Sequence, residues 1–118
     1  MPNFPIIDTH LHIWDMDRLN YSAFEGHPIF GRSYHIEDFQ QDCEELEVEA
    51  MVFVECFADF TETGGQYIDE IKFVEDSAKK DPRIKGIVPM APLNGVDQWS
   101  QCWGKCRLTT RLLREFVA

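Results

Sequence analysis

The sequence lacks the segments that direct a protein into or across a membrane. The residues before Phe4 include neither the basic cluster nor the apolar run of a secretory signal. The longest apolar run covers residues 50–54, far short of the roughly 20 residues that span a bilayer. We therefore expect a cytoplasmic protein.

Basic residues are also scarce. The 118 residues include 21 acidic and 11 basic side chains, which gives a net charge of −10 and a pI of about 4.7. This charge repels phosphate groups, so we expect neither nucleic acid nor an anionic membrane as a partner. The cysteines show no disulfide-rich pattern, which favours reduced thiols; they are Cys43, Cys56, Cys102 and Cys106.

The residues that are present describe a globular chain. With 44% hydrophobic and 27% charged residues, the chain has the composition of a folded protein, and its length suits one domain or part of one. The composition changes near residue 96, since only two of the 21 acidic residues but two of the three Trp lie in residues 97–118. We therefore predict a domain over residues 1–95 and a divergent tail over residues 96–118, helical or poorly ordered.

Apolar residues within 1–95 alternate between strand-like and helix-like patterns. Apolar positions three and four residues apart predict the helices, and short apolar runs predict the strands. The predicted strands are 4–11, 50–54 and 84–90, and the predicted helices are 36–46 and 66–80. This order is typical of parallel βαβ units in an α/β fold.

A long segment without periodicity, residues 13–34, follows the first predicted strand. Loops of this length inside a compact domain are uncommon and often functional. The segment is rich in aromatic residues, which leaves two interpretations. It covers a pocket, or it is a surface loop pinned by its own side chains.

Polar residues with metal-binding chemistry lie at the end of the first predicted strand. Because side chains alternate along a strand, Asp8, His10 and His12 should project from one side. Two imidazoles and a carboxylate can begin a site for a divalent metal such as zinc. The alternative is that one His caps the strand end and the other is only exposed.

The predicted fold places further residues beside this pair. In parallel α/β folds, sites lie at the carboxyl ends of the strands, and Glu55 ends the second predicted strand. Glu55 is therefore a candidate ligand or acid–base group, or else a solvated carboxylate. Asp8 is a candidate catalytic residue that would orient a ligand imidazole, because metal-bound His usually donates its other N–H to an oxygen.

The segment 8–15, Asp-Thr-His-Leu-His-Ile-Trp-Asp, resembles the start of proteins in the amidohydrolase-related family. This branch of the amidohydrolase superfamily includes sugar-acid lactonases and pyrone-dicarboxylate hydrolases. The segments Val52–Cys56 and Phe73–Val88 add to the resemblance, which covers about residues 5–95.

The resemblance implies the N-terminal part of a (β/α)₈ TIM barrel, about three βα units long. It implies a hydrolase that acts on a lactone or a similar cyclic ester or amide through a metal-activated water. His10 and His12 match the metal-binding motif of the family, in which some members use a divalent ion such as zinc and others none. The later site residues of the family have no counterpart, so we expect a truncated barrel with little activity of its own.

Other interpretations of the chain remain open. Three strands cannot close a barrel, so the exposed sheet edges would favour a non-catalytic fragment that self-associates or binds a protein partner. The tail either replaces the normal continuation or forms a divergent third helix. A metal or redox module at Cys102 and Cys106 is the weakest alternative, because Cys-x-x-x-Cys has no matching second pair.

Overall fold

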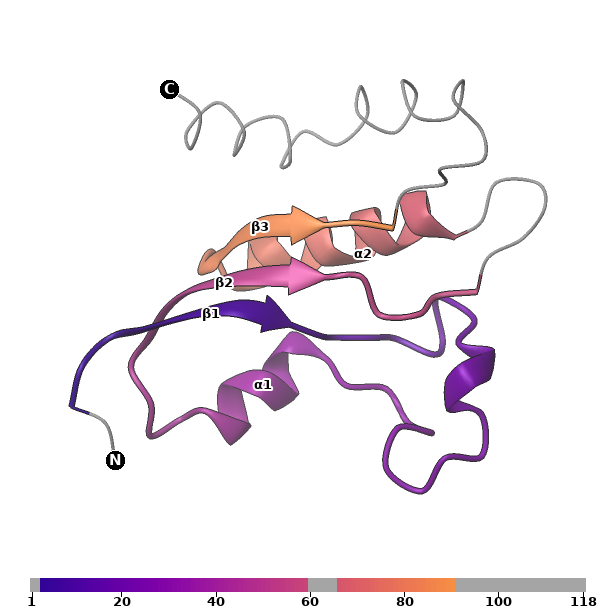
Figure 1. The fold of residues 1–118 in the computed structure, drawn as a ribbon, viewed down its shortest axis with the longest axis horizontal. Coiled ribbons are helices and arrows are strands. Elements are labelled where there is room, and N and C mark those ends of the chain that lie inside the picture. The colour runs from indigo at the N-terminus through magenta and orange to yellow at the C-terminus, as the bar shows by residue number, and fades with distance from the viewer. Residues whose placement is uncertain (1–2, 60–65, 91–118) are drawn as a thin grey trace.

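The described residues form a three-stranded parallel sheet with helices between successive strands. The computed structural model describes residues 3–59 and 66–90. The strands lie in the order β1 (Ile6–Leu11), β2 (Val48–Val54) and β3 (Ile84–Val88), and all three point the same way (Figure 1). Helix α1 (Ile36–Asp42) connects β1 to β2, and α2 (Tyr67–Lys80) connects β2 to β3. The predicted α/β class and the parallel βαβ order are confirmed.

The largest difference from the predicted elements is the end of α1. The helix stops at Asp42, whereas the apolar spacing predicts that it continues to Leu46. Acidic residues are concentrated around this end, where they repel the negative end of the helix dipole. Residues 43–45 form turns instead, and half-buried Leu46 still packs against the core.

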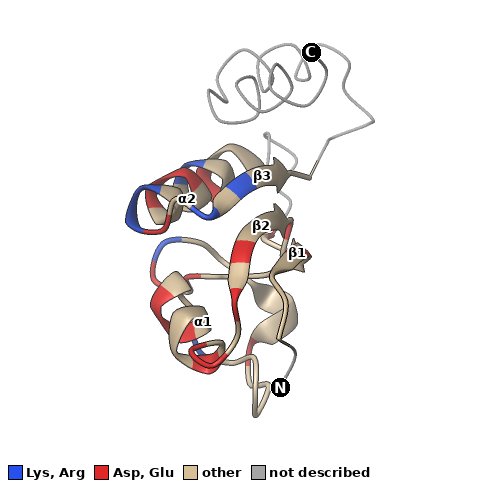
Figure 2. Ribbon diagram, turned by 90° about the vertical axis from the view of Figure 1, so that its left-hand side faces the viewer, with Lys and Arg blue, Asp and Glu red and all other residues tan. Residues whose placement is uncertain are grey.

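Both helices lie on the same side of the sheet (Figure 2). The side chains between the layers are almost completely buried; among them are Leu11, Ile36, Phe39, Met51, Phe53, Val74 and Ile87. The opposite face of the sheet is much more open in the described residues. Val52 and Val54 are half-buried there, and their neighbour Val88 is 51% exposed.

The register explains which side chains share the open face. Leu11 is paired with Phe53, and both side chains are buried on the helix side. Gly86 is paired with Val52, and a Cβ added to Gly86 would lie 3.2 Å from a Val52 methyl group. Because alternate residues point to opposite faces, His10 and His12 project from the same open face as Val52.

The long segment after β1 is pinned by its own side chains. Trp14 and Tyr34 form an antiparallel bridge, with N···O distances of 2.9 Å in both directions, and their rings stack at 5.4 Å. The Trp14 ring also contacts Phe24 of the short 3₁₀ helix η1 (Ser22–Phe24). These contacts match the interpretation of a loop pinned by its own side chains, while Asp15 and Arg18 of the same segment line a cleft that is described below.

The amino ends of the strands are joined by a compact polar network. Asp81, which is 3% exposed, accepts hydrogen bonds from Arg83 Nη2 at 2.7 Å and from Gln40 Nε2 at 3.0 Å. Arg83 Nη1 also donates to the Val48 carbonyl at 3.0 Å. This network therefore ties α1, the end of α2 and the starts of β2 and β3 together.

Several predictions concern residues outside the described ranges. They are the domain boundary at residue 95, the tail of residues 96–118, and the Cys102–Cys106 pair. Within residues 3–59 and 66–90, neither helix has the length and apolar character needed to cross a lipid bilayer.

Candidate functional site

The two predicted imidazoles lie together where β1 ends. The rings of His10 and His12 are 4.7 Å apart between centroids and meet edge to face at 74°. His10 is exposed and His12 is half-buried, so both remain within reach of solvent. Two imidazoles this close can contribute nitrogen ligands to a shared site.

The second histidine is held in one orientation by the neighbouring strand. His12 Nδ1 lies 3.0 Å from the Val54 carbonyl oxygen. Because a carbonyl oxygen only accepts hydrogen bonds, Nδ1 must carry the proton. The lone pair of His12 is therefore on Nε2. A fixed tautomer of this kind is usual for a metal-binding histidine.

Asp8 does not join the imidazoles in the way that simple alternation predicts. The register slips by one residue between Asp8 and Leu11, and Asp8 is paired with Met51, which faces the helices. Burial raises the pKa of the Cys43 thiol at the end of α1, and the Asp42 carboxylate and then that of Asp8 raise it further. Asp8 Oδ1 accepts a hydrogen bond from the His10 backbone N–H at 3.0 Å. Asp8 therefore holds the backbone at His10, and no described hydrogen bond joins it to a His10 or His12 ring.

Glu55 lies at the carboxyl end of β2, directly after the residue that holds His12. Its backbone N–H donates to the Val88 carbonyl at 2.9 Å, which ties the ends of β2 and β3 together. Its Oε2 accepts the Phe57 N–H at 3.0 Å. Phe57 has a φ of 54°, a left-handed conformation that is unfavourable for a bulky side chain. Glu55 therefore stabilises a strained turn, and one of its carboxylate oxygens has no described partner.

The described residues fit part of a metal site. Residues 3–59 and 66–90 contain no group of three or more His, Cys, Asp or Glu side chains arranged to hold a metal ion. The donor chemistry of His10 and His12 suits zinc, but catalytic zinc generally takes three protein ligands. The pair offers two nitrogen donors, one fewer than a zinc site of that kind uses.

A buried acidic group that the sequence reasoning missed lies beneath the turn after β2. Glu70 of α2 is only 2% exposed, and its Oε2 accepts the Cys56 backbone N–H at 3.2 Å. Burial raises the Glu70 pKa to about 7, the Cys56 N–H lowers it, and the nearby Glu55 charge raises it. The pKa of the Tyr21 phenol is raised by its own burial and then by Glu70. The Tyr21 hydroxyl is buried and makes no well-formed hydrogen bond with the described residues, although the Asp15 backbone lies close enough to lower its pKa.

The helical pattern contains a signal for Glu70. The predicted apolar face of α2 includes Tyr67, Ile71 and Val74, and Glu70 is three residues after the first and four before the last. Residues at these spacings lie on one face of a helix. An acid within an apolar helix face therefore indicates a buried carboxyl group.

The other histidines have structural partners. His27 Nδ1 accepts the backbone N–H groups of Ile29 and Phe30 at 3.1 and 3.0 Å, which fixes the tip of the long loop. His35 precedes α1, and its Nε2 lies 3.3 Å from an Asp15 carboxylate oxygen.

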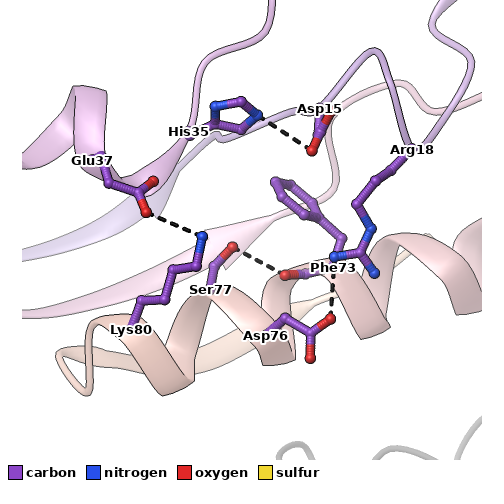
Figure 3. Close-up of a pocket in the computed structure, with 8 residues that line it drawn as sticks. All are labelled: Asp15, Arg18, His35, Glu37, Phe73, Asp76, Ser77 and Lys80. Atoms are coloured by element: carbon purple, nitrogen blue, oxygen red, sulfur yellow. Dashed lines mark hydrogen bonds and ion pairs between the residues drawn. The ribbon is translucent and has the colours of Figure 1, made fainter.

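A cleft of about 360 Å³ lies on the helix side of the sheet (Figure 3). Its lining consists of Asp15, Arg18, His35, Glu37, Phe73, Asp76, Ser77 and Lys80. Arg18 pairs with Asp76 at 3.1 Å, and Lys80 pairs with Glu37 at 3.1 Å. The Arg and Lys of the wall are thus already paired with its acids, and none of the predicted site residues lines the cleft.

The chain is similar to a curated protein and to a solved structure. No family model matches the chain. The uncharacterized protein y4mH of Sinorhizobium fredii (strain NBRC 101917 / NGR234) is 29% identical over 106 residues, which cover 82% of this chain and 34% of y4mH. Among solved structures, Amidohydrolase 2 from Bifidobacterium longum subsp. infantis is similar, with a TM-score of 0.58 and 22% identity. That match covers 79% of this chain and 38% of the other.

This chain therefore spans about a third of the curated relative and little more than a third of the solved structure. At 22% identity, the similarity to the solved structure shows a shared fold. The described residues have an amidohydrolase-like α/β fold, which matches part of the longer Amidohydrolase 2 chain.

Proposed function

We propose that this chain is part of a metal-dependent hydrolase of the amidohydrolase-related type, acting on a lactone or a similar cyclic ester or amide. The observation that carries the proposal is the contact between the His10 and His12 rings at the carboxyl end of β1. The amidohydrolase-like fold supports it, because sites in parallel α/β folds lie at this end of the sheet.

The residues have distinct roles in this proposal. His10 and His12 hold a divalent ion, most simply zinc, and the Val54 carbonyl keeps His12 Nε2 free to coordinate. The bound ion would polarise the scissile carbonyl or lower the pKa of a water molecule. Glu55 serves as general base through the carboxylate oxygen that the Phe57 N–H leaves free. Asp8 holds the backbone at His10 and takes no part in proton transfer.

The proposal also explains why the described residues alone should be poor catalysts. We propose that β1, β2 and β3 belong to a (β/α)₈ barrel, in which other strands supply the remaining ligands. Two imidazoles leave an open and weak site. We therefore expect the 118-residue chain to bind zinc weakly and to hydrolyse lactones slowly or not at all.

Zinc binding by the purified chain tests the proposal. Isothermal titration calorimetry should give one weak site, and His10→Ala or His12→Ala should each reduce its affinity at least about tenfold. His27→Ala is the matched control, because His27 fixes only its own loop tip. Binding that survives both single substitutions, or that is lost in the control alone, would contradict the proposal.

Lactone hydrolysis by the same protein tests the expected lack of turnover. Activity that is present in the purified chain and abolished by His10→Ala would support the assignment of the site. It would also show that two imidazoles suffice, contrary to the expectation above.

A second candidate function is self-association without catalysis. In the described residues, β1 and β3 each have one unpaired edge, and Val88 is 51% exposed on the open face. Free edges and exposed apolar side chains favour pairing between chains. Sedimentation analysis showing a concentration-dependent dimer would support this function, and a folded monomer at all concentrations would argue against it.

A further inference from the structure

We infer that Glu70 positions the turn after β2, residues 55–58, and that its protonation state determines whether this turn stays closed. The inference goes beyond the proposed hydrolysis, because it concerns a conformational change that needs neither metal nor substrate.

The geometry makes Glu70 the core-side anchor of the turn. Its carboxylate holds the Cys56 N–H at 3.2 Å from a position that is only 2% exposed. The turn is also attached at both ends, through the Glu55 N–H to Val88 and through the Asp59 N–H to Asn20, each at 2.9 Å. Cys56 itself is 3% exposed. Glu70 therefore holds the middle of the turn at Cys56, and the closed turn also shields the Glu70 carboxylate from solvent.

The titratable groups around Glu70 do little to stabilise its ionised carboxylate. The titratable groups that interact with it in the described residues are Tyr21, Glu55 and Cys56. Two of them are a buried phenol and a buried thiol, and the third is another carboxylate. Within residues 3–59 and 66–90, ionised Glu70 would be a nearly dry anion with one hydrogen bond, an arrangement that proteins avoid.

The turn itself is held in an unfavourable conformation. Phe57 lies in the left-handed region at a φ of 54°, and its side chain is 63% exposed. Such a residue persists only where its surroundings hold it there. When Glu70 ionises, opening the turn hydrates the carboxylate and relieves the strain at Phe57. The protonated form therefore keeps the turn closed, and the ionised form favours opening.

Hydrogen exchange at the Cys56 amide tests the inference in the full chain. The variant Glu70→Gln keeps an acceptor oxygen but cannot ionise. The ratio of exchange rates, wild type to Glu70→Gln at equal pH, cancels the intrinsic pH dependence of exchange. We expect this ratio to increase about tenfold or more between pH 5.5 and pH 8.5, because ionisation favours the open form.

Two controls make the result decisive. Asp69→Asn removes an exposed acid from the adjacent position of α2 and should behave like the wild type. In the wild type at pH 8.5, Cys56 should exchange at least about tenfold faster than Phe53, a core residue of β2. A ratio that stays constant with pH, or equal rates at Cys56 and Phe53, would overturn the inference.

Discussion

The two ends of the sheet each bury a carboxylate, but they surround it differently. At the amino end, hydrogen bonds from Arg83 lower the Asp81 pKa to about 2 against the opposing effect of burial, and Gln40 lowers it further. At the carboxyl end, the described residues offer Glu70 one backbone N–H as a partner, and burial raises its pKa to about 7. Both carboxyl groups are almost inaccessible to solvent, but Glu70 lies deeper among protein atoms and has fewer donors around it, and the two pKa shifts are opposite.

The difference shows where the fold uses polar groups for stability. The Asp81 network satisfies a buried charge and joins both helices to two strands. The carboxyl end instead has two imidazoles within reach of solvent, a strained turn, and a buried phenol that makes no well-formed hydrogen bond with the described residues. In α/β barrels, the amino end typically serves stability and the carboxyl end serves chemistry. The contrast within this small sheet agrees with that division.

The substitution Asp81→Ala should have the largest effect on stability. It leaves the Arg83 guanidinium without its partner, and because that side chain is 35% exposed we expect a loss of about 3 kcal/mol in the free energy of unfolding, at the low end for a broken buried pair. Urea denaturation followed by circular dichroism measures this change. The surface substitution Asp69→Asn should change stability by less than about 0.5 kcal/mol. A loss from Asp81→Ala as small as that would show that the network contributes little.

The next test is the pH dependence of stability. The pKa of Glu70 in the folded state, about 7, lies above its ordinary value of 4.5. The stability that Glu70 contributes is therefore fully present below pH 4.5 and is lost as the pH rises through 7. Relative to Glu70→Gln, the wild type should lose about 2 to 3 kcal/mol between pH 5 and pH 8.

Asp81 provides the opposite limb of this profile. Its folded-state pKa of about 2 lies below the ordinary 3.8, so its contribution is present above pH 3.8 and is lost as the pH falls through 2. Thermal denaturation across this pH range should show both limbs. Equal pH profiles for the wild type and Glu70→Gln would remove the basis of the comparison.

The smallest expected effect is that of Tyr21→Phe. This substitution removes a buried hydroxyl that makes no well-formed hydrogen bond with the described residues, and it keeps the ring that stacks on Phe24 at 5.6 Å. Because an unsatisfied buried polar group costs free energy, we expect a gain of about 1 kcal/mol in stability. Denaturation at pH 6 measures it. A clear loss of stability would mean that the hydroxyl has a partner after all.

The sequence was sufficient for the order of the elements, because that order depends on local patterns. The apolar run at 50–54 and the spacing in residues 66–80 became β2 and α2 with small changes at their ends. The predicted end of α1 is wrong. Apolar spacing continues to Leu46, but the helix stops at Asp42, where acidic residues repel the negative end of the helix dipole. Apolar periodicity indicates which side chains are buried, and Leu46 is still packed against the core although the helix has already ended.

The candidate site was only partly predictable. The spacing of His10 and His12 predicts neighbouring rings, and the structure has them in contact. The same rule fails for Asp8, because a register slip depends on how β1 pairs with β2 and leaves no local trace. Glu70 was visible as an acid in an apolar helix face. Its partner Cys56, however, is 14 residues away in sequence, and only the fold brings them together.

The central claim is that His10 and His12 form one metal-binding pair, with His12 held as the Nδ1–H tautomer. The ¹⁵N NMR spectrum of the imidazole nitrogens tests it directly, before and after one equivalent of zinc. We predict a protonated Nδ1 at His12 in the free protein, and zinc-dependent shifts at His12 Nε2 and at His10. Unchanged signals from both rings, or shifts confined to His27 and His35, would contradict the account.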